Sequence, residues 1–192
     1  DSATASVKTN FSGHHMLSAA HFSRQSAIIE KNYKNEITDE LRTEHRAYVT
    51  GAIIVSVASL EATINEVFIS AIDNDSLFKG FDPTIPKGLR DWYIKVKGRA
   101  PILEKYLRVL DVTNKEAFDQ GKSPYQEVYD LIQLRNALVH YKPEWDTDLK
   151  NHKGNHKGIE KRLKSRFNIN PFAHKNDAFF PKKCLGHGCA EW

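Results

Sequence analysis

The chain has 192 residues, of which 40% are hydrophobic and 27% are charged, and its formal net charge is +4. This length fits one domain with an appended arm, and the apolar fraction suffices for a packed core, so the composition excludes an intrinsically disordered protein. The two cysteines are too few for a disulfide-rich secreted scaffold. The small net charge does not by itself indicate a protein that binds nucleic acid.

Neither a signal peptide nor a membrane segment is predicted. Residues 1–30 are polar and lack the apolar core of a signal peptide. The longest uncharged apolar stretch, residues 47–60, is shorter than the roughly 20 apolar residues that cross a bilayer. We therefore expect a cytoplasmic protein. Because the chain begins without methionine and stops at Trp192 just after an apparent helix start, we also expect the natural protein to continue beyond this residue.

The first part of the chain predicts an arm followed by two helices. Residues 1–15 are small and polar, and we expect a flexible arm there, ahead of a single helical domain over residues 16–192. Helical spacing of apolar residues predicts one helix over 16–33 and a longer one over 41–73. The longer helix is apolar on two faces, as a central helix would be. Its main apolar positions are Val49, Ile53, Val57, Leu60, Ile64, Val67, Phe68 and Ile72.

The middle of the chain predicts a loop and two further helical segments. Residues 75–88 contain two prolines and several glycine or aspartate breakers, which predict a loop. Helical spacing returns over residues 89–110, with a kink expected at Pro101. The next helix is delimited more sharply, because Ser123 suits the N-cap position and Pro124 the first helical position.

We expect this last helix to run to Tyr141, before Pro143 stops it. No segment alternates polar and apolar residues with a period of two, so no sheet is predicted. The predicted fold class is all-α, an antiparallel bundle of four to five helices.

Residues 150–166 carry seven lysines or arginines against one acid, Glu160. One interpretation is a solvated basic loop insertion in the bundle, since runs of charge often serve only solvation. The other interpretation is an electrostatic track for a phosphate backbone. The residues that would bind RNA in this second interpretation are Lys161, Arg162, Lys164 and Arg166.

The helix over residues 125–141 has an unusual polar group on its apolar side. Its apolar positions, which fall in one stripe, are Val128, Leu131, Ile132, Leu138 and Val139. Arg135 falls in the middle of this stripe, where a guanidinium is costly unless it is paired or reaches a wet cleft. Asn136 and His140 are four residues apart and share a face at the edge of the stripe. A cation, an amide and a titratable imidazole thus lie close together.

The simpler interpretation of this pattern is structural. Arg135 would lie at the edge of the core and pair with an acid from another helix, Glu61 being a candidate, while His140 would only cap its helix. An arginine followed by four residues and a histidine is a pattern that often occurs by chance.

The run Leu-Arg-Asn-Ala-Leu-Val-His over residues 134–140 resembles the R-x4-6-H signature of the HEPN superfamily, in which the residue after arginine is usually polar. Residues 59–66 on the earlier long helix also resemble a run in uncharacterised members, and the order of the helices is similar. The resemblance covers roughly residues 45–145. One difference is that Tyr141 follows the histidine directly, whereas many toxin members have His-x-Tyr, and Lys142 holds that later place here.

The resemblance implies a metal-independent endoribonuclease with no cofactor, of a kind common in toxin–antitoxin and phage-defence systems. It implies a homodimer in which two motif helices face one another, RNA as the substrate, and an antitoxin as a further partner. His140 would relay the proton of a 2′-hydroxyl that attacks the adjacent phosphate, which Arg135 would hold. Asn136 would orient either group, and the product would be a 2′,3′-cyclic phosphate.

Two rival functions stay open. The superfamily also contains members that bind without cutting, so the alternative is a non-catalytic module that binds RNA or a protein. A purely structural helical bundle is the third hypothesis.

No metal site is expected. Cys184, His187 and Cys189 would supply three soft ligands, whereas a structural zinc site takes four and usually contains a Cys-x2-Cys pair. His152 and His156 have helical spacing, but the glycines beside them predict a loop.

Overall fold

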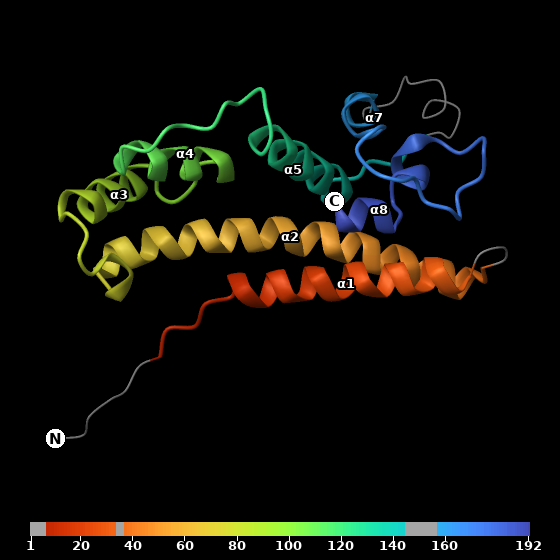
Figure 1. Cartoon of the computed structure of the whole chain (residues 1–192), viewed down its shortest axis with the longest axis horizontal. Helices are drawn as coiled ribbons and strands as arrows, with labels where there is room; N and C mark the ends of the chain where they lie inside the picture. Colours follow the sequence, from red (N-terminus) through yellow and green to blue (C-terminus); the bar gives the residue numbers. More distant parts are fainter. Residues whose placement is uncertain (1–6, 34–36, 145–156) are drawn as a thin grey trace. The chain divides into compact units, whose positions relative to one another are not determined.

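The computed structural model describes residues 7–33, 37–144 and 157–192, and every regular element in these residues is helical. The helices are α1 (Ser12–Asn32), α2 (Asp39–Asp73), α3 (Thr84–Lys95), α4 (Ile102–Val112), α5 (Tyr125–Val139), α7 (Lys157–Leu163) and α8 (His187–Glu191), with two short turns, η1 (Ser76–Phe78) and η2 (Phe179–Lys183) (Figure 1). The predicted all-α helical bundle is confirmed for this part of the chain.

Contacts divide the chain into two compact units, each with its own core. Unit 1 combines Asp1–His15 with Ala58–Phe118, and unit 2 combines Met16–Val57 with Asp119–Trp192. Helix α2 therefore contributes residues to both units, its first half to unit 2 and its second half to unit 1. The single domain expected over residues 16–192 stays a prediction.

Helix α1 begins at Ser12, inside the segment for which we expected a flexible arm. The carboxylate of Glu66 accepts hydrogen bonds from the backbone N–H groups of Phe11 and Ser12, at 2.9 and 3.0 Å, and from the Ser12 hydroxyl at 2.7 Å. The first N–H groups of a helix have no partner inside the helix, so a carboxylate at this point stabilises the helix start. Lys8 adds ion pairs to Asp73 at 3.1 Å and Asp75 at 2.9 Å.

The region between residues 75 and 112 differs from the prediction in two ways. The predicted loop contains the start of α3, because Asp82 Oδ1 accepts the N–H and the hydroxyl of Thr84 at 2.8 and 2.7 Å. The kinked helix predicted over 89–110 is wrong. Lys97 and Gly98 have φ values of +51° and +66°, and this left-handed pair separates α3 from α4.

The core of unit 1 is built on aromatic stacking. Phe68 of α2 is fully buried, and its ring stacks on Tyr93 with a centroid distance of 4.9 Å and on Trp92 at 5.3 Å. Lys105 of α4 is also buried, and its ammonium donates to Asn65 Oδ1 at 2.8 Å. Burial lowers the pKa of Lys105, against the smaller opposing effect of Glu61.

In unit 2, α1 and the first half of α2 form an antiparallel pair (Figure 1). The two helices approach closely at Gly51, where an added Cβ would lie 3.0 Å from the ring of Phe22. The core that covers this pair takes residues from α2, α5, α7 and the C-terminal segment. Its buried members are Val49, Ile53, Leu134, Ile159, Leu163, Phe179, Phe180, Cys184, Leu185 and Cys189.

Part of the basic segment is helical rather than a solvated loop. Residues 157–163 form α7, and Ile159 and Leu163, four residues apart, are 6% and 1% exposed in the core of unit 2. These two apolar residues gave no clear helical signal in the sequence because charged residues dominate their neighbourhood. Residues 150–156, with His152 and His156, lie outside the described residues.

Helix α2 is, among the described residues, the one helix long and apolar enough to cross a membrane by length and composition. The core helix of a soluble protein has the same properties, and α2 supplies buried side chains to both cores. The structure is thus compatible with a soluble protein, and the cytoplasmic location stays a prediction.

Leu163→Ala should lower the free energy of unfolding by about 2–5 kcal/mol, because it would leave a cavity in the core of unit 2. Lys161→Ala is the matched control on the exposed side of α7, and we expect a change within about 0.5 kcal/mol. Chemical denaturation measures both. Two equally small effects would contradict the packing of α7.

Candidate functional site

Helix α5 contains Arg135 and Asn136, and the third residue of the motif, His140, follows its last residue. The helix ends at Val139, so His140 is the residue that caps the helix rather than a member of its last turn. The backbone N–H of His140 donates to the carbonyl of Asn136 at 2.9 Å, which keeps the predicted four-residue relation between them. His140 is exposed, whereas Asn136 is half-buried. The imidazole is therefore open to a ligand from solvent.

At its other end, α5 begins at Tyr125, with Pro124 as the capping residue. The Ser123 hydroxyl bonds the Glu127 carboxylate at 2.9 Å and makes no capping bond to the backbone of the helix. The N-cap predicted for Ser123 is therefore wrong.

The buried stripe of α5 is centred one residue earlier than we predicted. Leu134 is fully buried, and Leu131, Ala137 and Leu138 pack around the same core. Arg135 follows Leu134 and is rotated from it by about 100°, so it lies at the edge of the stripe instead of its middle. On this edge Val139 is 50% exposed.

Arg135 has a buried donor, its Nε–H group. Its side chain is half-buried, and its Nε atom has no hydrogen-bond partner among the residues that the structure describes. Leaving a buried donor unsatisfied costs about 1–3 kcal/mol. An anion that reached this N–H group would recover that cost.

The basic segment is tied to α5 by a buried acid that the sequence analysis missed. Asp130 is 2% exposed and lies 3.2 Å from Arg162 Nε and 3.8 Å from Arg166 Nη2. Arg166 also pairs with Glu127 at 3.4 Å. The sequence does contain a signal for this acid. Asp130 lies four residues before Leu134 and so on the same face of the helix, where a buried charge needs a partner.

These ion pairs give a structural role to two of the four residues that we predicted to bind RNA. Arg162 and Arg166, which we expected in solvent, have internal partners and hold the segment onto α5. Lys161 is exposed, and Lys164 makes a surface pair with Glu160 at 3.3 Å. The two lysines are therefore the side chains freer to meet a phosphate backbone.

The Cys–His–Cys run at the C-terminus serves packing. Burial raises the pKa of Cys189 to about 12 and that of Cys184 as well, so both thiols stay protonated. His187 Nδ1 lies 3.3 Å from the Ser26 hydroxyl. Within the described ranges, no three His, Cys, Asp or Glu side chains are placed to hold a metal ion. The expectation of a metal-independent protein stays a prediction.

Comparison with protein-family models, with curated proteins and with solved structures finds no match for this chain. The HEPN resemblance therefore depends on the sequence alone, through residues 59–66, residues 134–140, the C-terminal run over residues 184–192 and the order of the helices, and it stays a hypothesis.

Arg162→Gln should lower the free energy of unfolding by about 1–3 kcal/mol, because it leaves the buried Asp130 carboxylate with a weaker partner. Adding Asp130→Asn should recover part of this loss, since the buried charge is then removed. Lys164→Gln breaks only a surface pair and should cost at most about 1 kcal/mol. Denaturant titrations of wild type, Arg162→Gln, Asp130→Asn and the double variant give the coupling energy. Strictly additive effects of the first two substitutions would mean that the ion pair contributes nothing.

Proposed function

We propose that the protein is a metal-independent endoribonuclease of the HEPN type, with Arg135, Asn136 and His140 as its catalytic residues. The observation that carries this proposal is the buried Nε of Arg135, which has no hydrogen-bond partner among the described residues, on the helix that ends at the exposed His140. Phosphoryl chemistry on RNA needs one fixed cation and one group that moves a proton near neutral pH. The two side chains supply these functions.

In the proposed reaction, the oxygen of a 2′-hydroxyl attacks the adjacent phosphorus while neutral His140 accepts the hydroxyl proton. The bond from phosphorus to the 5′ oxygen breaks, and His140 passes the proton that it accepted to this leaving oxygen. Arg135 donates to the phosphate oxygens as negative charge grows on them, and Asn136 orients the imidazole or the phosphate. The products are a 2′,3′-cyclic phosphate and a 5′-hydroxyl. DNA lacks the 2′-hydroxyl and is not a substrate.

A homodimer forms part of the proposal. Three apolar or aromatic side chains on α5 or just after it are partly exposed: Tyr129 at 38%, Val139 at 50% and Tyr141 at 40%. Exposed apolar groups near a site favour a contact with a second copy, and a two-fold axis would bring two motif helices together. The setting we propose is a toxin–antitoxin or phage-defence system, with an antitoxin as the partner protein.

RNA would approach along the exposed side of α7. Lys161 and Lys164 face solvent there, while Arg162 and Arg166 keep α7 attached to α5 and add positive charge from their partly exposed guanidinium groups.

His140→Ala and Arg135→Ala should each lower RNA cleavage by about 10²–10⁴-fold, the usual contribution of a positioned acid–base group. Asn136→Ala should have a smaller effect, since orienting a group is easier to replace. His21→Ala and Arg24→Ala, two exposed positions on α1, are the matched controls and should cleave like wild type. Cleavage is followed on end-labelled RNA in EDTA, and mass spectrometry should find the cyclic phosphate.

Three outcomes decide between the hypotheses. Cleavage that requires Mg²⁺, or that survives His140→Ala, would overturn the mechanism. RNA binding without cleavage would favour the non-catalytic module. His140→Ala should leave the melting temperature nearly unchanged because the residue is exposed. A large loss of stability would instead support a structural role.

Light scattering at micromolar concentration should give about twice the 21.9 kDa chain mass. Val139→Glu places a charge in the proposed contact and should yield a monomer with little cleavage activity. Ile28→Glu, at a position on α1 that is 48% exposed, is the control and should stay dimeric. A wild-type protein that is monomeric at every concentration would contradict a site composed of two motif helices.

A further inference from the structure

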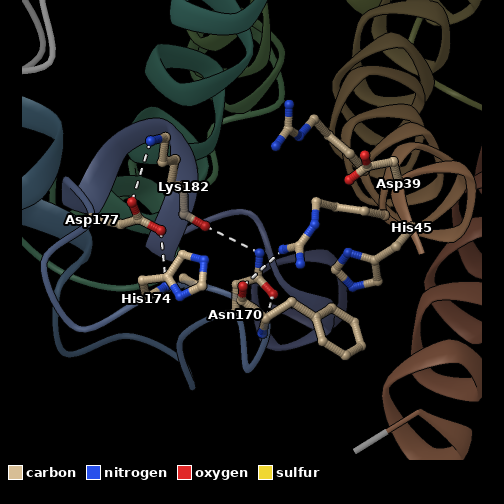
Figure 2. A pocket seen from close by; sticks show the side chains of 10 residues that line it. Asp39, His45, Asn170, His174, Asp177 and Lys182 are labelled. Carbon is tan, nitrogen blue, oxygen red and sulfur yellow. Dashed lines mark hydrogen bonds and ion pairs between the residues drawn. The ribbon is translucent and has the colours of Figure 1, made fainter. Parts of the chain in front are cut away.

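Unit 2 contains a polar cavity of about 300 Å³ that no part of the motif lines. It lies between the start of α2 and the segment over residues 170–182. Figure 2 shows Asp39 and His45 on the α2 side and His174 and Lys182 on the opposite side. A pocket of this volume stands at the small end of the range for ligand sites, about 300–1,000 Å³, so it suits a small ligand or one group of a larger one.

Positive side chains outnumber acidic ones in the lining. Arg42, Arg46 and Lys182 are cationic, against the carboxylates of Asp39 and Asp177. One of these acids, Asp177, already has hydrogen-bond partners within the protein. Asp177 accepts the backbone N–H of His174 at 2.8 Å and the ammonium of Lys182 at 3.2 Å.

The two arginines keep donors available for a ligand. Arg42 uses Nη1 to donate to the carbonyl of Phe172 at 2.9 Å, which fixes the guanidinium and leaves its other N–H groups for a further acceptor. The Arg46 side chain is exposed and has neither a hydrogen bond nor an ion pair among the described residues. His174 adds an exposed imidazole on the facing wall.

Hydrogen bonds hold both walls of the cavity in place. His45 is 2% exposed, its Nε2 lies 2.8 Å from Glu30 Oε1, and its ring meets the ring of Phe172 edge-on at 5.1 Å. On the facing wall, the Asn170 side chain accepts the Phe172 N–H at 2.9 Å and donates to the Lys182 carbonyl at 3.1 Å. These contacts fix the walls from within the protein, so binding would require little ordering of the walls.

We propose that this cavity is a binding site for a phosphate group, carried either by a small phosphate ester or by a polynucleotide. Guanidinium groups on one wall and an imidazole on the other reach oxygens that point in different directions, which suits a tetrahedral phosphate better than a planar carboxylate. The proposal does not depend on the ribonuclease activity, because Arg135, Asn136 and His140 are absent from the lining.

The test is a two-dimensional ¹⁵N–¹H NMR titration with inorganic phosphate, with adenosine 5′-monophosphate, and with a short oligoribonucleotide that lacks terminal phosphates. Inorganic phosphate should shift the amide signals of residues 170–182 in a saturable manner, with a Kd of roughly 1 mM or below. Arg46→Gln and His174→Gln should each weaken binding about tenfold, as expected for a lost charge-assisted hydrogen bond. Arg24→Gln and His21→Gln, their matched controls on the exposed face of α1, should bind like wild type.

The probes separate the two sources of phosphate. Saturation by the monophosphate alone assigns the site to a small ester, whereas saturation by the oligoribonucleotide assigns it to a nucleic-acid backbone. The absence of saturable shifts up to about 10 mM phosphate, or equal affinity in wild type, Arg46→Gln and His174→Gln, would overturn the proposal. Arg135→Ala should bind phosphate normally, so failure of this proposal and failure of the ribonuclease proposal are distinguishable.

Discussion

The carboxylate of Glu30 accepts hydrogen bonds from two segments that are far from it in the sequence. Its Oε1 atom lies 2.8 Å from Nε2 of the buried His45 ring and accepts the backbone N–H of His187 at 2.6 Å. One oxygen of α1 thus fixes a histidine of α2 and the start of α8. Burying a polar group without a partner is costly. The hydrogen bonds of Glu30 therefore favour the arrangement in which α1, α2 and the start of α8 lie together. Both the position of His45 in the wall of the phosphate-site cavity and the position of α8 against α1 depend on these hydrogen bonds.

The buried acid of α5, Asp130, shows why a basic sequence is an ambiguous signal. Asp130 draws Arg162 and Arg166 toward α5, while Ile159 and Leu163 anchor α7 in the core. The same cations therefore serve the fold, whatever they do for RNA. Charge density along a sequence cannot separate these roles, because it does not reveal which cations face a buried carboxylate.

Local spacing was sufficient to predict some helices of the fold, but not every break between helices. Periodicity and a following proline were sufficient for α2 and α5, since helix formation over several turns depends on local spacing. The break between α3 and α4 was missed because Lys97, in a left-handed conformation beside Gly98, carries no strong signal of its own.

The two candidate sites also differ in how much of each could be predicted from the sequence. The motif of α5 is contiguous, so its residues could be named from the sequence, but the position of Arg135 at the edge of the stripe required the burial of Leu134. The cavity could not be predicted, because Arg46 and His174 are brought together only by the folded chain.

The division of the chain between the units has a consequence for the order of events during synthesis. Apart from its N-terminal residues, unit 1 is one continuous stretch, Ala58–Phe118, and its contacts can form as soon as that stretch leaves the ribosome. Unit 2 must wait, because Met16–Val57 packs against Asp119–Trp192. Until those later residues emerge, Val49 and Ile53 present their apolar side chains without the core that finally covers them. The nascent chain therefore passes through a period in which one apolar face of the first half of α2 is exposed to chaperones and to aggregation.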